Sequence, residues 1–301
     1  MHLPLVSVVM SIRNGGRNLL GSIQSILEQK DLDFEFILVN DGSTDETEQF
    51  LSLIANKDSR IRLLTREAKG LTMSLIEGCM EARGEFIARQ DAYDYSMPDR
   101  LRIQAERLQA ESDASMCSSH VRFITQERVG VFVQAFNESV TQDGLFGIIH
   151  GSTMFRKEAY MKVGGYREEF YYAQDVDLWS RLVEVGKHII EPQILYENCI
   201  HPGSISSARK KEQTTLHSFI LNATKARREG RDESIWLARA SSFSEKCRVE
   251  SKKKVNQSRG AYFIGSCLMK NHPLLAKKYL RMSLQSNPLS VRTRLKILSL
   301  K

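Results

Sequence analysis

The sequence predicts an α/β protein with a Rossmann-like, mostly parallel sheet, followed by an α-helical C-terminal region. In the first part of the chain, short β-branched apolar runs alternate with stretches of helical period. From residue 205 onward Gly and Pro are sparse and long amphipathic runs begin. Residues 205–301 hold 22 Lys or Arg and 6 Asp or Glu, a balance of +16, which leaves −9 of the net +7 for residues 1–204. We therefore expect two parts, residues 1–204 and 205–301.

The elements expected in the first part alternate between strand and helix. Apolar runs of strand length predict strands at 5–12, 34–40, 61–65 and 86–88. Ser43 with Glu46 three residues later is typical of a capping box that opens a helix. Residues 71–82 have the spacing of a further helix. This alternation predicts βαβ units with right-handed crossovers.

Polar clusters follow three of the expected strands, at residues 11–13, 40–41 and 91–94. Ligands of open parallel sheets bind beyond the carboxyl ends of the strands, so these clusters are expected to converge on one crevice. Asp91 and Asp94 fit Mg²⁺ or Mn²⁺, which one or two carboxylates hold together with substrate phosphates. A solvated or helix-capping loop is the alternative for an isolated Asp-x-x-Asp. The sequence contains no glycine-rich phosphate loop, which disfavours a nucleotide-cofactor dehydrogenase and a P-loop enzyme.

Five segments in order resemble the family 2 glycosyltransferases, inverting enzymes with the GT-A nucleotide-diphospho-sugar transferase fold. They are VSVVMSIRNGGRNLLGSIQSILEQ, FILVNDGSTDET, ARGEFIARQDAYDYSMPDRL, HGSTMFRKEAYMKVGGYREEF and QDVDLWSRL. The resemblance covers roughly residues 4–205. It implies transfer of a sugar from a nucleotide-diphosphate donor, expected to be a UDP-sugar, to a hydroxyl of a glycan or lipid-linked glycan. The implied setting is assembly of a bacterial surface polysaccharide or lipopolysaccharide.

The resemblance also implies roles for individual residues. Asp175 corresponds to the catalytic base, and Asp94 to the direct ligand of a Mn²⁺ or Mg²⁺ cofactor. Asp91 would contact the ribose or reach the metal through water, and His201 would add a further metal ligand. The other expected contacts to the nucleotide sugar are Ser11, Arg13, Asp41, Arg89, His150, Gly151 and Ser152.

Structural roles are the alternatives for several of these residues. Asp175 could simply cap a helix, His201 could be an ordinary loop histidine, and Arg89 could form an ion pair with the neighbouring acids. Asp177 and Arg181 are spaced four apart, which is typical of a pair on a helix surface. Trp179 is expected in the core rather than as a platform for a sugar.

Three positions depart from the family pattern. Tyr93 stands where many members carry a third acid, Gln174 replaces the usual Glu before the base, and Asn40 replaces a common Asp. These departures keep open a catalytically weak scaffold that binds nucleotide sugars. A sugar nucleotidyltransferase is the other alternative, because IRNGGRN partly resembles its loop after the first strand.

The C-terminal region is expected to form helix hairpins, with breaks at 271–273 and 287–288. Its basic surface could serve solubility, an anionic membrane surface or nucleic acid. We expect no nucleic-acid partner, because no zinc finger or convincing aromatic and basic module is present. The five cysteines form no C-x-x-C pair, and no window has the run of about 18 apolar residues that a membrane span needs. The cysteine pattern and the lack of such a run predict a cytoplasmic location. The basic C-terminal surface allows peripheral attachment to the inner face of the membrane.

Overall fold

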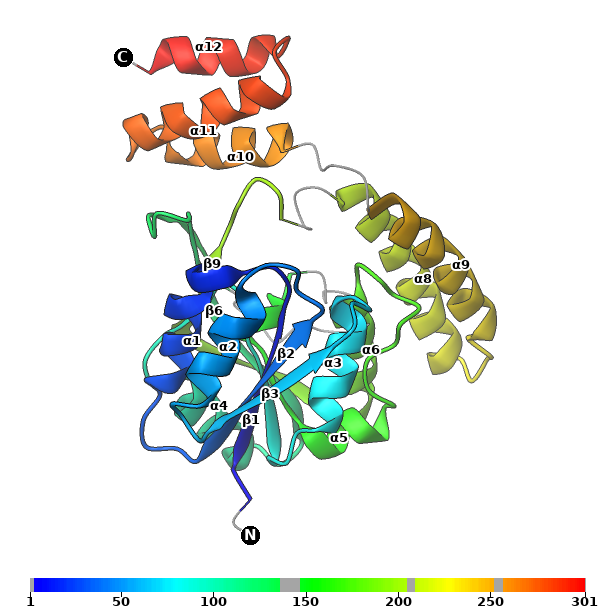
Figure 1. The fold of residues 1–301 in the computed structure, drawn as a ribbon. Coiled ribbons are helices and arrows are strands. Elements are labelled where there is room, and N and C mark those ends of the chain that lie inside the picture. Colours follow the sequence, from blue (N-terminus) through cyan, green and yellow to red (C-terminus); the bar gives the residue numbers. More distant parts are fainter. Residues whose placement is uncertain (1–2, 136–146, 205–208, 252–256, 301) are drawn as a thin grey trace.

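A computed structural model describes residues 3–135, 147–204, 209–251 and 257–300. Within these ranges the chain forms a nine-stranded sheet of order β3-β2-β1-β4-β8-β6-β9-β5, with β7 paired to β6 (Figure 1). The strands are β1 (Val6–Ile12), β2 (Phe34–Asp41), β3 (Ile61–Arg66), β4 (Phe86–Arg89), β5 (Tyr95–Ser96), β6 (Ala114–Ile124), β7 (Gly130–Gln134), β8 (Met154–Arg156) and β9 (Lys187–Cys199).

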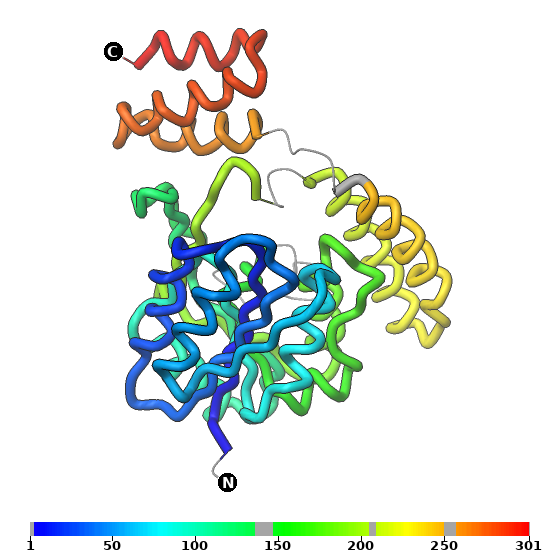
Figure 2. The backbone as a smooth tube through the Cα atoms, viewed as in Figure 1, coloured from blue at the N-terminus to red at the C-terminus, as the bar shows by residue number. Residues whose placement is uncertain are grey.

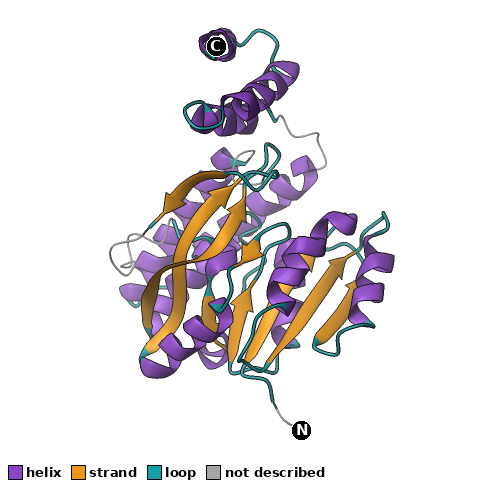
Figure 3. Cartoon of the chain, turned by 90° about the vertical axis from the view of Figure 1, so that its left-hand side faces the viewer, coloured by secondary structure: helices purple, strands orange, loops and turns teal. Residues whose placement is uncertain are grey.

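Helices cover both faces of the sheet and make up the C-terminal region (Figures 1 and 3). In the sheet part they are η1 (Gly16–Leu19), α1 (Leu20–Leu27), α2 (Thr47–Ala55), α3 (Leu71–Met80), α4 (Arg100–Ala110), η2 (His150–Ser152), α5 (Lys157–Lys162) and α6 (Gln174–Val185). In the C-terminal region they are α8 (Lys210–Arg228), α9 (Ser234–Ser251), α10 (Ser258–Leu268), α11 (Pro273–Ser286) and α12 (Val291–Ser299). The predicted α/β class and the C-terminal helices are confirmed, and the predicted breaks at 271–273 and 287–288 separate α10, α11 and α12.

Parallel pairing brings the ends of three strands together. β1 pairs in parallel with β2 and with β4, and β2 pairs in parallel with β3. The carboxyl ends of β1, β2 and β4 therefore lie at one edge of the sheet, with Ile12 opposite Asn40 and Val9 opposite Arg89. Beyond β4 the pairing is mixed, because β8 runs antiparallel to β4 and β6 while β6 and β9 are parallel.

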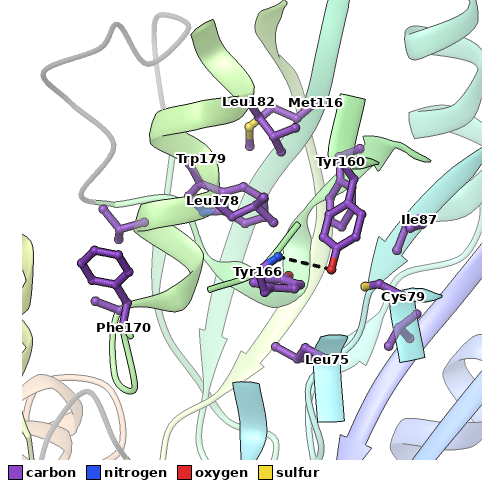
Figure 4. Packing of buried hydrophobic residues seen from close by; sticks show 14 of the residues in the cluster. Leu75, Cys79, Ile87, Met116, Tyr160, Tyr166, Phe170, Leu178, Trp179 and Leu182 are labelled. Carbon is purple, nitrogen blue, oxygen red and sulfur yellow. Dashed lines mark hydrogen bonds between the residues drawn. The ribbon is translucent and has the colours of Figure 1, made fainter. Parts of the chain in front are cut away.

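The predicted strands are continuous apolar runs because the sheet is covered on both sides. Val8 and Met10 of β1 pack in the cluster formed with α1, α2 and α4, whereas Val9 packs in the cluster formed with α3, α5 and α6. Figure 4 shows the second cluster, where Trp179 lies among aliphatic and aromatic side chains and is fully buried. The expectation that Trp179 is a core residue is confirmed.

The predicted capping box is wrong. Helix α2 begins at Thr47, and the Asp45 side chain, rather than that of Ser43, accepts a hydrogen bond from the Thr47 backbone N–H at 3.1 Å. Ser43 Oγ instead accepts from the backbone N–H of Asn14 at 3.0 Å. Ser43 thus joins the loop after β2 to the loop after β1, a long-range contact that a local motif does not reveal.

The prediction that Asp177 and Arg181 form a surface pair is also wrong. Both side chains are buried, and Arg181 Nη2 lies 2.5 Å from Asp177 Oδ2. The physical reason is that α8 and α9 cover this side of α6, with Leu216 of α8 and Ala240 of α9 in the same hydrophobic cluster as Trp179. Figure 2 shows α8 and α9 along one side of the sheet, apart from α10–α12. The boundary at residue 204 stays a prediction, although the core continues across it.

Candidate active site

A cavity of about 480 Å³ lies at the carboxyl ends of β1 and β4. It brings together six of the residues predicted for the site: Ser11, Asp91, Asp94, His150, Asp175 and His201. A larger hollow, of about 650 Å³, lies at the opposite ends of the strands, near Leu5 and Gly84. None of the predicted site residues lines that hollow, so the smaller cavity is the candidate active site.

Asp91 and Asp94 flank a tight turn at the rim of the cavity. The Asp94 backbone N–H donates to the Asp91 carbonyl at 3.3 Å, and Tyr93 between them has a left-handed φ of 71°. Asp94 is buried, and its two carboxylate oxygens accept from Asn198 Nδ2 and from the Cys199 backbone N–H, each at 2.8 Å. Burial and, second, the charge of Asp91 raise the pKa of Asp94 well above its ordinary value. Ionising Asp94 beside Asp91 is therefore costly unless a cation offsets the charge.

Arg89 is fully buried and forms the ion pair that the sequence left open. Its Nη2 lies 2.6 Å from Asp91 Oδ1, and its Nε donates to His150 Nε2 at 3.1 Å. Its Nη1 donates to the carbonyls of Val9 and Gln90. The guanidinium is thus held on several sides beneath the cavity, and it fixes the position of the Asp91 carboxylate. Its predicted contact to the nucleotide sugar stays a prediction.

His150 is neutral in this arrangement. Arg89 can only donate, so Nε2 of His150 must be the unprotonated nitrogen, and the Tyr166 hydroxyl, 2.6 Å away, then also donates to it. Burial and the nearby Arg89 charge lower the pKa of His150 well below its usual value. His150 therefore accepts a hydrogen bond that helps to position Arg89, while part of His150 lines the cavity wall.

Gly151 and Ser152 contribute to the site indirectly, through packing and hydrogen bonds that position neighbouring residues. A Cβ on Gly151 would lie 1.9 Å from the Tyr196 hydroxyl, which itself accepts from the Asp91 backbone N–H at 3.1 Å. Only glycine leaves room for this tyrosine. Ser152 is buried, and its Oγ donates to the Ile149 carbonyl at 2.8 Å. Neither residue lines the cavity formed by the described residues.

The cluster after β2 does not converge with the other two. The Asp41 carboxylate is paired with Arg66 at 3.0 Å and accepts from the backbone N–H groups of Lys69 and Gly70. Asp41 thus holds the loop that leads into α3, and it does not line the cavity as the described residues define it. Arg13 is exposed in the loop after β1. Asn40 is buried, and its Nδ2 has no hydrogen-bond partner within the described ranges.

Asp175 lies in the first turn of α6, as predicted, and faces the cavity. Its Oδ1 accepts from the Val176 backbone N–H at 2.9 Å. Burial, assisted by the charge of Asp91, raises the pKa of Asp175 to about 6. Gln174 beside it is 5% exposed, and its Oε1 has no hydrogen-bond partner among the described atoms. A carboxylate that is mostly ionised at neutral pH thus lies next to a buried amide that a polar ligand could satisfy.

The described residues fit a divalent cation through two carboxylates. In the described part of the chain no group of three or more His, Cys, Asp and Glu residues is arranged to hold a metal ion, so Asp91, Asp94 and His201 do not form a three-ligand set. Burial and the charge of Asp91 nevertheless make ionisation of Asp94 costly, and a bound cation would offset that cost. Two carboxylates with phosphate oxygens and waters are a common environment for Mg²⁺.

Two tyrosines form an aromatic wall of the cavity that the sequence did not predict. Tyr171 and Tyr172 line it with ring centroids 4.6 Å apart. Helices α8 and α9 hold their loop: Gln213 Nε2 donates to the Tyr172 carbonyl at 3.2 Å, and Ser244 Oγ accepts from the Tyr171 backbone N–H at 3.2 Å. The only signal was the aromatic run FYYA directly before QDVDLW.

Comparison with known sequences shows the family of this chain. The sequence model described as "Glycosyl transferase family 2" matches residues 7–164. The chain belongs to glycosyl transferase family 2. This family 2 glycosyltransferase is 35% identical to EpsE of Bacillus subtilis over 191 residues, which are 61% of this chain and 68% of EpsE. It is 29% identical to the O-antigen biosynthesis glycosyltransferase WbnJ of Escherichia coli, over 60% of this chain and 72% of WbnJ. The match favours a glycosyltransferase over the nucleotidyltransferase alternative.

Solved structures with the same fold support the GT-A assignment. Residues 1–349 of TarS from S. aureus in complex with UDP-GlcNAc align with a TM-score of 0.58 and 18% identity, over 98% of this chain and 88% of that one. A mannosyltransferase from Pyrobaculum calidifontis, PcManGT, in complex with GDP-Man and Mn²⁺, aligns with a TM-score of 0.58 and 16% identity, over 99% and 88%. The expectation of a GT-A glycosyltransferase fold is confirmed.

Proposed function

We propose that this family 2 glycosyltransferase inverts configuration as it moves a sugar from a nucleoside diphosphate, most simply UDP, to a hydroxyl of a glycan or lipid-linked glycan. One observation carries the proposal. Asp175, with a pKa of about 6, lines the same cavity as Asp91 and Asp94 at the carboxyl edge of the sheet. A base and a pair of acids that can hold a cation against the diphosphate are the two groups that such a transfer needs in one place.

The acids of the turn after β4 support the donor half of the site. Asp94 and Asp91 would hold Mn²⁺ or Mg²⁺ together with diphosphate oxygens and waters, and His201 lines the same cavity without completing a three-ligand set among the described residues. Such an ion, when bound, supplies Lewis-acid stabilisation of the negative charge that develops on the leaving diphosphate. Arg89 and the Tyr196 hydroxyl keep the Asp91 side chain and backbone in place for this task.

Asp175 supports the acceptor half. At neutral pH its carboxylate is mostly ionised, because its pKa is about 6. It would accept the proton of the acceptor hydroxyl as that oxygen attacks the anomeric carbon from the face opposite the diphosphate, which inverts configuration. General-base catalysis of this kind contributes about 100-fold to 10,000-fold, and holding the two substrates in line supplies much of the rest.

The relatives support a biological setting. WbnJ is named for O-antigen biosynthesis, and a chondroitin synthase of Escherichia coli matches 75% of this chain but only 33% of its own length. We infer that this protein takes part in assembling a bacterial surface polysaccharide. The departures Tyr93 and Gln174 leave a weakly active member as the second candidate, because the buried Oε1 of Gln174 would serve ligand binding without catalysis.

The decisive experiment combines binding and turnover. Calorimetry of the purified chain against a panel of nucleotide sugars with Mn²⁺ should identify the donor, and Asp175→Asn should bind that donor as tightly as wild type yet lose transfer. Release of nucleoside diphosphate would support the transferase, release of pyrophosphate would support a nucleotidyltransferase, and release of neither would support a scaffold. Wild-type turnover in Asp175→Asn would remove this residue from the role of base.

A further inference from the structure

The end of the chain is basic without any acidic residue. After Glu250 the sequence contains 12 Lys or Arg and no Asp or Glu. Eight of these basic residues lie in α10–α12 or in the short connections between them. A cationic surface of this kind attracts an anionic partner through a field that salt screens.

Helix α12 adds an aliphatic face to this charge. Val291, Leu295 and Leu298 follow the i, i+4, i+7 spacing of one helix face and are 66%, 61% and 77% exposed. Leu289, just before the helix, is 85% exposed. Thr293 is buried on the opposite side. The helix packs inward through Thr293 and the half-buried Ile297, and Leu300 joins the cluster of α10 and α11. It thus has apolar side chains on its inner side and a second aliphatic face that is exposed, which an ordinary surface helix lacks.

Basic side chains flank that aliphatic face. Arg292 and Arg294 are exposed, and at 100° per residue they fall on either side of the line through Val291, Leu295 and Leu298. Helices that lie in the plane of a membrane interface combine an apolar face with flanking Lys and Arg, which meet anionic headgroups. A nucleic-acid partner would use the charges but would leave the aliphatic side chains in water. None of the described helices has the length and hydrophobicity needed to cross a bilayer.

The position of these helices relates the face to the active site. Figures 1 and 3 both show α10–α12 beyond the carboxyl ends of the strands, on the side of the sheet where the cavity lies. Helix α10 packs closely on the segment after β9, because a Cβ on Gly260 would lie 2.5 Å from the Pro202 carbonyl oxygen. His201, next to Pro202, lines the cavity.

A second contact fixes α11. Glu127, in the turn between β6 and β7, pairs with Lys278 at 2.7 Å and accepts from the Tyr279 hydroxyl at 2.9 Å. Val129 and Val131 on the same hairpin pack against the small hydrophobic cluster of α10 and α11. Helices α10 and α11 are thus attached directly to the sheet part near the cavity, and α12 packs on α11.

We propose that the aliphatic and basic face of α12 docks on the surface of an anionic lipid bilayer. Docking through this face would hold the active-site mouth close to acceptors carried in the membrane. Only this consequence for acceptors rests on the proposed function; the docking itself does not.

The test is sedimentation of the full chain with vesicles of phosphatidylcholine, alone or mixed with phosphatidylglycerol. We expect binding to the anionic vesicles only, and weaker binding as salt rises. The variants V291S/L295S/L298S and R292Q/R294Q should each lower the partition constant by about tenfold or more. The control variants L53S/M80S and K30Q/K57Q, which change exposed residues of the sheet part, should bind as wild type does.

Three results would overturn the docking proposal. One is wild-type protein that ignores anionic vesicles, with or without binding to nucleic acid. Another is unchanged partition of both α12 variants. The third is a wild-type dimer that V291S/L295S/L298S converts to a monomer in light scattering while vesicle binding is unchanged, which would assign the face to a second copy. Donor binding measured without vesicles reports on the proposed function separately, so the two ideas fail independently.

Discussion

The two sides of helix α6 carry acids with opposite surroundings. Asp175 faces the cavity, where its carboxylate accepts one backbone hydrogen bond and its pKa is about 6. Asp177, two residues later, faces α8 and α9 and lies 2.5 Å from Arg181 and 3.8 Å from Arg167. Burial raises the pKa of both carboxyl groups, but only Asp177 has Arg side chains beside it as ion-pair partners. The two positions therefore differ in the Arg side chains around the carboxylate and not in the residue type.

The buried side continues as a network between secondary-structure elements. Arg167 also pairs with Glu233 at 2.9 Å, and Arg227 of α8 pairs with both Glu233 and Glu184. Buried ion pairs are costly to break, because the remaining charge is left without compensation in a medium of low dielectric. We therefore read this side of α6 as structural and the cavity side as chemical.

The strongest test of that division is Asp175→Asn. Loss of the base should lower the transfer rate by about 100-fold or more, while donor binding and the fold are retained. The measurement is kcat with the identified donor, together with circular dichroism. Asp177→Asn is the matched variant on the other side, and equal losses of kcat per folded molecule in both variants would erase the distinction.

Asp177→Asn should act on stability instead. Removing Asp177 leaves the buried Arg181 without its ion-pair partner, while Arg167 keeps Glu233. Breaking a buried pair in this way lowers the free energy of unfolding by about 3–5 kcal/mol. Denaturant unfolding monitored by fluorescence measures the change. A loss within error of zero would show that the network contributes little.

The sequence predicted strands β1–β4, missed the five strands that follow, and predicted the partners of the charged groups poorly. Apolar runs such as Val6–Ile12 are visible because both faces of the strand are buried. The spacing of Asp177 and Arg181 looks the same whether a helix face is exposed or covered by helices that follow later in the chain. Asp41 was expected to contact the nucleotide, yet its partners, Arg66 and the amides of residues 69 and 70, depend on how the loop after β3 folds.

Gly151→Ala tests whether the packing next to the cavity matters for both stability and ligand binding. The new methyl group would displace Tyr196 and with it the hydrogen bond to the Asp91 backbone. We expect a loss of about 1–3 kcal/mol in stability together with weaker binding of donor and metal. Gly130→Ala, which meets no atom within 4 Å, is the control. Normal affinity for the donor in Gly151→Ala would show that the turn tolerates movement of Tyr196.

The raised pKa of Asp175 predicts two opposite dependences on pH. The value of kcat/KM should fall as pH drops through about 6, since the protonated carboxyl cannot accept a proton. Stability should change the other way: the folded state holds this proton more tightly than the unfolded chain, so the stabilising contribution is lost as pH rises through about 6. Asp175→Asn should therefore raise the melting temperature above pH 6 but not in strong acid. If Asp175→Asn had the same melting temperature as the wild type at neutral pH, that result would argue against the raised pKa of Asp175.

The smallest expected effect comes from Ser244→Ala on α9. Its hydroxyl accepts from the Tyr171 N–H and donates to the Glu169 carbonyl at 2.6 Å, so the change should loosen the aromatic wall and cost about 1 kcal/mol. We expect a higher KM with little change in kcat. Ser242→Ala, an exposed neighbour on the same helix, should behave as wild type. An unchanged KM in Ser244→Ala would separate α9 from substrate binding.

The shared core of α6, α8 and α9 limits how this enzyme can be taken apart or recombined. A chain cut after residue 204 would lose Leu216 and Ala240 from the cluster that contains Trp179, and would leave Glu184 without Arg227. A chain that ends after Ser251 would keep that cluster and the supports of the aromatic wall. Chimeras with relatives should therefore exchange α10–α12 as a unit and leave α8 and α9 with their own sheet. Such chimeras would change the surface to which the enzyme binds without altering its substrate pocket.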